Sequence, residues 1–473
     1  MPDAPPAAAP ATALIVLAAG KGTRMKSTLP KPLHPVAGVP MVQRVLRAGM
    51  GADPDVVAIV VSPETAGIVS ALDTDIPVAP VMQDPPRGTG EAARLALEAL
   101  PDAARAVVLF SDNPLLEAQH MRELVQRATE TGALVTMLTA NVQDAAHYGR
   151  IVRDAEGHPV AVVEKKDDDP ALRTGQEVEI NSGIMVLDAA WARRTLQALP
   201  PNPVSGEYYL TDLIAAAVAA RSNDARWPVA TVTAPITAAL GVNDRVELAE
   251  AEELAWARNR ERAMRAGVTM RLPETIIMDD DVEIGPDSVI LPNTMLLGRT
   301  HIGSGAVIGP GAVITDSTLG NGVVVRNSTL TDVEVGDGSD VGPYAHLRGG
   351  ARVAGGVHIG NFAEIKNSDL ASGVKVGHFS YLGDARIGAE TNVGAGTITA
   401  NFDGVHKHRT EIGERVFLGS DTILRAPIRL GDDARTGAGS VVTKDVEPGA
   451  TVVGVPARQI RRKPTAETHG EEG

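Results

Sequence analysis

The chain has 473 residues, of which 44% are hydrophobic and 22% charged, and this length predicts two or three globular domains. The net charge of −15 argues against a nucleic-acid binder, and the absence of cysteine excludes disulfides, thiolate metal sites and a cysteine nucleophile. Residues Met1–Pro10 contain no basic residue and the apolar run Leu14–Ala19 is short, so we expect no signal peptide, no membrane partner and a cytoplasmic protein.

From Ala13 to about Asn243, short apolar runs alternate with amphipathic patterns. The runs expected to form buried strands are Ala13–Ala18, Val56–Val61, Ala106–Phe110 and Leu134–Leu138. The patterns expected to form helices are Met41–Ala48, Glu91–Leu100 and Glu117–Thr129. This alternation is typical of an α/β domain with a mainly parallel sheet, which binds its ligands beyond the carboxyl ends of the strands.

The first expected strand runs directly into a glycine-rich turn, Leu17–Met25. Such a turn lets backbone N–H groups approach a polyphosphate closely. It is not a Walker loop, because no Gly-Lys-Ser/Thr closes it, and it lacks the third glycine of the dinucleotide fingerprint. Arg24 and Lys31 add two cations that can neutralise the charge developed during attack at phosphorus.

Asp112 comes directly after the expected strand Ala106–Phe110. A carboxylate at a strand end that faces a phosphate loop is a natural ligand for Mg²⁺. The alternative is a turn-forming role before Pro114.

Residues 244–266 contain neither glycine nor proline and end at Gly267, which predicts one long, highly charged helix between domains. After Leu272 an aliphatic residue recurs every six positions, which predicts a parallel β-helix with three short strands per coil. General crossover rules favour right-handed coils. The hexad positions are Ile302, Ile308, Val335, Val341, Leu347, Val353, Ile359, Ile365, Val376, Leu382, Ile412, Leu418, Leu424, Leu430 and Thr436.

The hexad pattern breaks at residues 399–409, and insertions in a solenoid form loops on one face, often the binding face. His378 lies shortly before this break, and histidine is suited to general-base catalysis near neutral pH. Since the chain has no cysteine, a mechanism through an acyl-cysteine intermediate is excluded. A surface histidine without catalytic function is the alternative.

The segment Leu17–Met25 followed by Pro30-Lys31 resembles the signature of sugar-phosphate nucleotidyltransferases. With its hexad region, the chain from about Leu14 to Arg458 resembles the bacterial bifunctional N-acetylglucosamine-1-phosphate uridyltransferase/glucosamine-1-phosphate acetyltransferases. The resemblance implies N-acetylation of glucosamine 1-phosphate with acetyl-CoA. UMP transfer from UTP would then give UDP-N-acetylglucosamine and pyrophosphate for peptidoglycan and lipopolysaccharide precursors. It also implies Mg²⁺, a left-handed β-helix and a homotrimer with the acetyl site between subunits.

The implied organisation is a Rossmann-like α/β nucleotidyltransferase domain, a linker helix and a hexapeptide-repeat acetyltransferase domain. These parts are expected at residues 12–243, 244–271 and 272–460, with a disordered N-terminus at 1–11 and a flexible tail at 461–473.

For the uridyl site, the resemblance places Arg24 and Lys31 on the phosphates as catalytic cations, and Asp112 and Asn243 on Mg²⁺. Phe110-Ser111-Asp112 stands where Tyr-Gly-Asp is common, which keeps the metal ligand but changes the backbone contact beside it. The residues matched to UTP and the UDP-sugar are Leu17, Ala18, Ala19, Gly20, Lys31, Gln83, Gly88, Thr89, Gly149, Glu164, Asn181 and Asn243.

For the acetyl site, the resemblance makes His378 the catalytic base and Glu364 its orienting partner. Phe402 replaces a common tyrosine, and Gly454 an arginine seen in some relatives, so Arg458 or residues 461–463 could bind the CoA phosphates. A solvated tail is the alternative for 461–463. The residues matched to the acetyl acceptor are Arg348, Lys366, Tyr381 and Asn392. Those matched to acetyl-CoA are Ala395, Asn401, Phe402, Ser420, Ala438 and Arg458.

Two other functions fit parts of the pattern. A single-activity nucleotidyltransferase could use its β-helix only for assembly or regulation, but the long hexad region with His378, Glu364 and an inserted loop favours the bifunctional enzyme. A regulatory scaffold without activity is disfavoured by the intact Arg24, Lys31 and Asp112.

Overall fold

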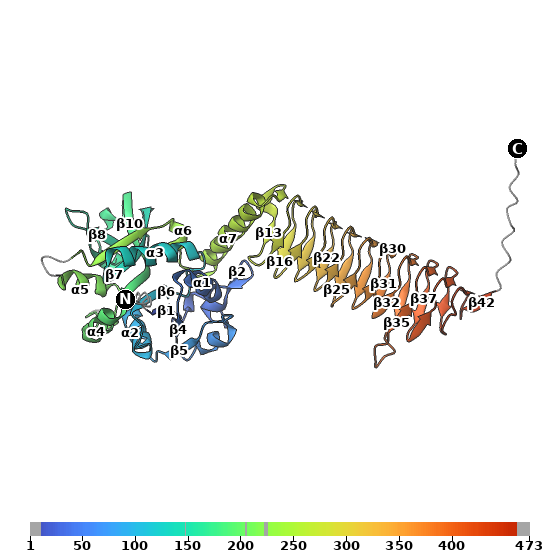
Figure 1. The fold of residues 1–473 in the computed structure, drawn as a ribbon, viewed down its shortest axis with the longest axis horizontal. Helices are drawn as coiled ribbons and strands as arrows, with labels where there is room; N and C mark the ends of the chain where they lie inside the picture. The colour runs from blue at the N-terminus through green and yellow to red at the C-terminus, as the bar shows by residue number, and fades with distance from the viewer. Residues whose placement is uncertain (1–10, 147, 204–205, 222–225, 461–473) are drawn as a thin grey trace, which may run out of the picture. The chain divides into compact units, whose positions relative to one another are not determined.

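The computed structural model describes residues 11–146, 148–203, 206–221 and 226–460. The termini predicted to be disordered or flexible lie outside these residues, apart from Ala11, and so do residues 461–463. The chain forms two compact units, Met1–Ala255 and Trp256–Gly473 (Figure 1). No helix of the described ranges is both long and apolar enough to cross a membrane.

The first unit is built around a mixed sheet with the strand order β11-β7-β10-β6-β1-β4-β5, and β8 and β9 form a hairpin beside β10. Its strands are β1 (Thr12–Leu17), β4 (Val56–Val61), β5 (Val78–Met82), β6 (Arg105–Phe110), β7 (Val135–Asp144), β8 (Arg150–Arg153), β9 (Pro159–Val163), β10 (Thr174–Asp188) and β11 (Val229–Thr233). The main path is parallel except at β10, which runs antiparallel to both β6 and β7. A mainly parallel sheet is therefore confirmed, with one reversed strand.

Helices cover both faces of this sheet, which explains why its strands are continuous apolar runs. Along β1, Ala13 and Ile15 join one core, whereas Leu14 and Val16 join the core on the other face. The helices are α1 (Met41–Gly49), α2 (Thr89–Ala99), α3 (Ala118–Thr131), α4 (Ala189–Ala198), α5 (Asp212–Ala219) and α6 (Ile236–Ala239). The three helices and four strands expected from the sequence are thus present, with small shifts at their ends.

Helix α7 (Arg245–Arg265) confirms the long charged helix predicted over residues 244–266. Its start is fixed by Asp244, whose side chain accepts hydrogen bonds from the backbone N–H groups of Val246 (2.9 Å) and Glu247 (3.0 Å). The boundary between the two compact units falls within this helix, after Ala255.

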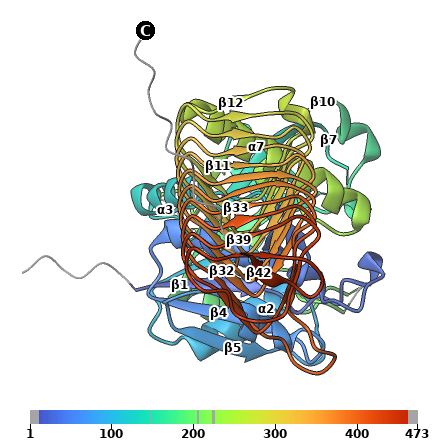
Figure 2. The same ribbon diagram turned by 90° about the vertical axis from the view of Figure 1, so that its right-hand side faces the viewer.

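The second unit is a parallel β-helix whose successive coils stack on three sheets (Figures 1 and 2). One sheet contains β12 (Thr269–Met270), β15 (Val289–Ile290), β18 (Val307–Ile308), β21 (Val324–Val325), β24 (Asp340–Val341), β27 (His358–Asn361), β30 (Lys375–His378), β33 (Asn392–Val393), β36 (Phe417–Leu418), β39 (Arg435–Thr436), β41 (Thr451–Val453) and β42 (Arg458–Ile460). The predicted hexapeptide β-helix is therefore confirmed.

The other two sheets complete each coil. The second contains β13 (Ile277–Met278), β16 (Met295–Leu297), β19 (Val313–Thr315), β22 (Thr329–Thr331), β25 (His346–Arg348), β28 (Glu364–Lys366), β31 (Tyr381–Gly383), β34 (Ile398–Ala400), β37 (Ile423–Arg425) and β40 (Val441–Val442). The third contains β14 (Glu283–Ile284), β17 (His301–Ile302), β20 (Thr318–Leu319), β23 (Glu334–Val335), β26 (Arg352–Val353), β29 (Asp369–Leu370), β32 (Ala385–Ile387), β35 (Thr410–Ile412) and β38 (Ile428–Leu430). The left-handed coil stays a prediction of the resemblance.

The interior of the β-helix is filled by the predicted hexad residues. All of the aliphatic members are buried, and each packs on its equivalent in the next coil. Thr436, which keeps the period without being aliphatic, is also buried, and its hydroxyl accepts a hydrogen bond from the N–H of Gly419 at 2.9 Å. The polar atom is thereby satisfied inside an apolar core.

Both ends of the β-helix are covered by chain of a different kind. At the first coils, Asn259 and Arg260 of α7 donate to the carbonyl oxygens of Met278 (3.0 Å) and Ile276 (2.9 Å), and Ala263 packs into the core. At the far end β42 turns back and pairs antiparallel with β41.

The predicted insertion forms a loop that protrudes from the side of the β-helix near β35 (Figure 1). A bridge between Phe402 and Lys407 and a 2.7 Å hydrogen bond from His408 N to the Asn401 carbonyl close the loop at its base. The loop joins β34 to β35, which resumes the stacking on β32.

Candidate active sites

The glycine-rich turn borders a cavity of about 340 Å³ in the first unit. Strand β1 ends at Leu17, and the Ala18 N–H still bonds the carbonyl of Val60 at 2.8 Å, so the sheet fixes the start of the turn. Gly22 has φ +58°, and a Cβ there would lie 2.5 Å from the Cβ of Lys31, so this position requires glycine. The predicted residues that line the cavity are Leu17, Ala19, Gly20, Lys31, Gln83, Gly88, Thr89 and Asp112.

Four predicted polar residues contact one another beside this cavity, and two of them, Lys31 and Asp112, line it. The Lys31 ammonium donates to Asp112 Oδ2 at 2.5 Å and to Asn243 Oδ1 at 3.1 Å. Arg24 donates to the same amide oxygen at 2.9 Å. The phosphate-binding cations and the two metal-ligand candidates, predicted from four separate segments, therefore form one cluster.

Backbone hydrogen bonds hold this cluster together. Asp112 follows the carboxyl end of β6, and its carbonyl accepts from Val242 N at 2.8 Å, which ties the two ligand-bearing segments to each other. Asn243 N donates to Glu247 in the first turn of α7 at 2.6 Å. Asp112 and Asn243 both bond the ammonium of Lys31, and their carboxylate and amide oxygens are of the kind that Mg²⁺ prefers as ligands.

A segment with three of the residues matched to UTP and the UDP-sugar, Gln83, Gly88 and Thr89, lines the same cavity. The buried Gln83 amide nitrogen donates to the Gly88 carbonyl (3.0 Å) and to Glu91 (2.9 Å), so this side chain shapes the segment from inside. Gly88 has φ +105°, and a Cβ there would lie 2.5 Å from the Tyr208 carbonyl oxygen. Thr89 accepts a 3.1 Å hydrogen bond from Leu210 N.

A second cavity, of about 470 Å³, is lined by further residues that the resemblance matches to UTP and the UDP-sugar. Gly149, Glu164 and Asn181 all line it, and Asn181 N donates to the Gly149 carbonyl at 2.9 Å. Phe110 and Tyr209, which were not predicted as site residues from the sequence, line both cavities together with Thr89. The two cavities therefore adjoin, as a site for a nucleotide and a sugar phosphate requires.

A largely buried ion cluster contacts the backbone of Tyr148, which lines the second cavity. The Asp168 carboxylate accepts from Arg150 at 2.5 and 2.8 Å and from Arg173 at 3.0 Å. Arg173 also donates to the Tyr148 carbonyl at 2.6 Å. The hydrogen bond from Arg150, with that from Arg173, holds the pKa of Asp168 below its usual range despite burial.

We expect Asp168→Asn to destabilise the first unit by about 3 kcal/mol, because two guanidinium groups lose a buried counterion. A carboxyl group with a lowered folded-state pKa contributes stability above its unfolded pKa of about 4, and this is lost as the pH falls through the folded value. The difference between wild type and variant in chemical unfolding should therefore be full at pH 7 and shrink in acid. A difference that does not change between these conditions would contradict this role.

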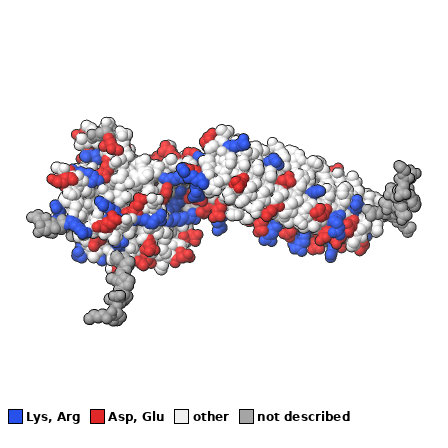
Figure 3. Space-filling model, turned by 45° about the horizontal axis from the view of Figure 1, so that its top comes forward, with Lys and Arg blue, Asp and Glu red and all other residues white. Residues whose placement is uncertain are grey.

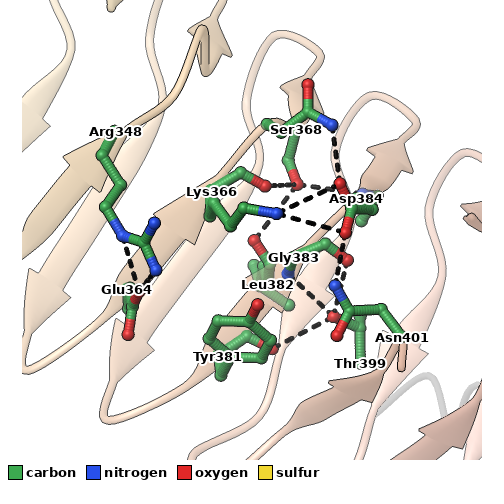
Figure 4. A network of polar contacts seen from close by, with 12 residues as sticks. Arg348, Glu364, Lys366, Ser368, Tyr381, Leu382, Gly383, Asp384, Thr399 and Asn401 are labelled. Carbon is green, nitrogen blue, oxygen red and sulfur yellow. Dashed lines mark hydrogen bonds and ion pairs between the residues drawn. The ribbon is translucent and has the colours of Figure 1, made fainter. Parts of the chain in front are cut away.

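In the second unit, three of the four predicted acceptor-binding residues, Arg348, Lys366 and Tyr381, lie on the neighbouring strands β25, β28 and β31 of one sheet (Figure 4), whereas Asn392 lies on β33 of another sheet. Arg348 donates twice to Glu364, at 2.9 and 2.6 Å. Lys366 lies 3.4 Å from Asp384, which also accepts from Asn401 at 2.5 Å. Burial acts to raise the pKa of Asp384, but hydrogen bonds from Asn367 and Asn401 and the nearby ammonium outweigh it and lower the pKa.

His378 ends strand β30, and its Nδ1 lies 3.0 Å from the side-chain oxygen of Asn361. Glu364, which the resemblance makes the partner of this histidine, is in register with Tyr381 on a different sheet and bonds Arg348. The structure therefore joins His378 to Asn361, and the orienting role of Glu364 stays a prediction.

The residues matched to acetyl-CoA follow His378 along one corner of the β-helix. Backbone hydrogen bonds between successive coils run from Gly396 to Phe379 (3.0 Å), from Asp421 to Ala395 (2.7 Å) and from Gly439 to Ser420 (2.8 Å). His378, Ala395, Ser420 and Ala438 each precede a corner residue of this ladder, so they form one column. Outside it, Arg458 lies on β42, and Phe402 is exposed on the inserted loop.

Three polar residues of this region were not predicted as site residues from the sequence, namely Asn361, Asp384 and Lys407. Lys407 lies on the inserted loop, and the neighbouring Lys366 side chain lowers its pKa through direct contact and like charge. The position of Lys407 in a loop expected on the binding face was a usable signal. The other two depend on which side chains become neighbours in adjacent coils, which the sequence does not show.

An α/β unit with cations and a carboxylate around a nucleotide-sized cavity, followed by a hexapeptide β-helix with a histidine-bearing corner, defines a nucleotidyltransferase joined to an acyltransferase. Residues 14–179 match the MobA-like NTP transferase domain, and residues 281–316 match the bacterial transferase hexapeptide (six repeats). The chain belongs to the family of the bifunctional GlmU proteins, the uridyltransferase/acetyltransferases that make UDP-N-acetylglucosamine.

Similarity to this family extends over almost the whole chain. Bifunctional protein GlmU of Alkalilimnicola ehrlichii is 42% identical over 96% of this chain and 95% of that protein. The proteins of the same name from Pseudomonas fluorescens and Heliobacterium modesticaldum are 43% and 41% identical, each over 93% of this chain and over 95% and 94% of those proteins.

Proposed function

We propose that the residues described above divide the two reactions between the two units. The second unit N-acetylates glucosamine 1-phosphate with acetyl-CoA, and the first transfers UMP from UTP to the product. The observation that supports this division best is the cluster of Arg24, Lys31, Asp112 and Asn243 beside two adjoining cavities.

In the uridyl reaction, an oxygen of the sugar 1-phosphate attacks the α-phosphorus of UTP in line, and pyrophosphate leaves. Asp112 and Asn243 would hold Mg²⁺, which neutralises phosphate charge when it is bound. Arg24 and Lys31 bind the phosphates, while Gln83, Gly88 and Thr89 orient the base. Gly149, Glu164 and Asn181 bind the sugar, so most of the catalysis comes from positioning and charge.

In the acetyl reaction, His378 accepts a proton from the amino group of the sugar as the nitrogen attacks the thioester carbonyl. A C–N bond forms, the C–S bond breaks, and the proton passes to the departing CoA sulfur. Arg348 and Lys366 bind the sugar phosphate, and the cation of Lys407 adds to this positive cluster. Tyr381 and Asn392 contact the sugar, Glu364 holds the Arg348 guanidinium in place, and Ala395, Asn401, Phe402, Ser420, Ala438 and Arg458 bind acetyl-CoA.

The acetyl site is completed between subunits of a homotrimer in this proposal. Much of the β-helix face visible in Figure 3 carries no charged side chain, and the charged ones gather along one edge. A face of this kind suits packing against a second copy better than an evenly charged one does.

UTP and acetyl-CoA as substrates place the enzyme in the cytoplasm.

The purified protein should convert glucosamine 1-phosphate, acetyl-CoA and UTP with Mg²⁺ to UDP-N-acetylglucosamine. Mass spectrometry is expected to show N-acetylglucosamine 1-phosphate when UTP is omitted and no uridylylated product when acetyl-CoA is omitted. Omitting the metal should stop only the second step. Accumulation of UDP-glucosamine without acetyl-CoA would contradict the proposed order.

A further inference from the structure

The imidazole of His378 has one side-chain hydrogen-bond partner in the part of the chain that the structure describes, the amide of Asn361. The two residues are in register on the neighbouring strands β27 and β30. Their ring nitrogen and amide oxygen lie 3.0 Å apart, which is hydrogen-bond distance. The stacking of the two coils therefore brings this pair together without any contribution from the inserted loop.

The chemistry of an amide oxygen decides which ring nitrogen carries the proton. A carbonyl oxygen only accepts hydrogen bonds, so Nδ1 of His378 must be the donor in this contact. In a neutral imidazole the other nitrogen, Nε2, then has the free electron pair that a base needs. With the amide turned over, its NH₂ group would donate to Nδ1, and Nε2 would be protonated and unable to accept a proton from the substrate.

We propose that Asn361 is the positioning residue that keeps His378 in the tautomer competent for proton abstraction. This inference rests on the proposed function, in which His378 is the base of the acetyl reaction. Asn361 acts through the imidazole and does not touch the reacting atoms.

Few other groups near the His378 ring could fix its tautomer. Strands β27 and β33 pair with β30, and the other titratable side chains on these three strands are His358 and Lys375, three positions before the Asn361–His378 pair. His358 bonds Asp340 at 2.8 Å. On a different sheet of the β-helix, Glu364 accepts a hydrogen bond from Arg348. A neutral amide orients the ring without the added stabilisation of the protonated form that a carboxylate would give.

Two substitutions of Asn361 separate orientation from charge. Asn361→Ala removes the acceptor, and we expect the kcat of acetyl transfer to fall about 10- to 100-fold with the KM for both substrates nearly unchanged. Asn361→Asp keeps an acceptor but adds a negative charge. It should retain activity at high pH, with the acidic limb of its pH–rate profile about one unit higher than in wild type.

A direct readout is ¹⁵N NMR of the imidazole nitrogens in the full-length protein, assigned with His378→Ala. The Nδ1–H form should predominate in wild type and lose population in Asn361→Ala. Melting temperature and UTP-dependent pyrophosphate release serve as internal controls for folding in each variant.

The outcomes distinguish this inference from the function on which it rests. If His378→Ala retains acetyl transfer, the base assignment fails and the inference fails with it. If His378→Ala is inactive while Asn361→Ala keeps wild-type kcat and tautomer, only the inference is overturned. A pH profile that moves in Glu364→Gln and not in Asn361→Asp would also overturn it, because the carboxylate would then be the partner.

Discussion

Substitution of His378 by alanine is expected to reduce acetyl transfer on the order of 10²- to 10⁴-fold, which is the usual contribution of a general base. The side chain ends strand β30, and its imidazole projects from the corner column that carries the residues matched to acetyl-CoA. Release of CoA with glucosamine 1-phosphate as acceptor measures this step. Pyrophosphate release from UTP and N-acetylglucosamine 1-phosphate should stay near the wild-type rate, because a different unit carries out that reaction.

A matched control is available on the neighbouring strand. His358 of β27 belongs to the same sheet and also bonds one side chain of an adjacent coil, Asp340. His358→Ala should therefore leave both activities almost unchanged. Equal losses of CoA release in the two variants would mean that any histidine on this face is needed for folding, and would remove the catalytic interpretation.

Substitution of Asp112 by alanine is expected to have the complementary effect, a loss of uridyl transfer on the order of 10²- to 10³-fold with acetyl transfer retained. The carboxylate is the charged member of the predicted metal pair and also the partner of Lys31 at 2.5 Å. The variant should need a higher Mg²⁺ concentration for half-maximal pyrophosphate release, since it loses a ligand oxygen.

The control for this variant is Glu98→Ala. This substitution removes an exposed carboxylate of α2 that forms an ion pair with Arg94 at 2.8 Å. It should change neither the rate nor the magnesium requirement. If Asp112→Ala has an unchanged magnesium requirement and a normal rate, Asp112 is not a metal ligand.

The repeat and the buried strands were predictable because a single property, the period of apolar residues, determines them. Ile359 and Leu418 had to point inward wherever the coil lay, and both are buried. The antiparallel course of β10 (Thr174–Asp188) was not predictable in this way, since direction depends on which strands become neighbours.

The same distinction explains which residues of the candidate sites were predictable from the sequence. Arg24, Lys31 and Asp112 could be chosen because each lies at the end of a recognisable element, and their convergence follows from the parallel strands. The partner of His378 could not be chosen, because Asn361 and Glu364 both lie about one coil before it in the sequence. Only the register between coils selects Asn361. Lys407 could have been chosen from its position in the inserted loop, whereas its contact with Lys366 depends on how that loop folds back.

The covered ends of the β-helix have a consequence for the state of the protein in solution. The last coil at an uncovered end has unpaired backbone N–H and C=O groups. These groups could pair with the end of a second molecule, and repeated pairing would produce fibres. Helix α7, through Asn259 and Arg260, pairs with such groups at one end, and the reversed strand β42 pairs with them at the other. The same helix that precedes the β-helix in the chain thus also covers part of the edge at which such growth would begin.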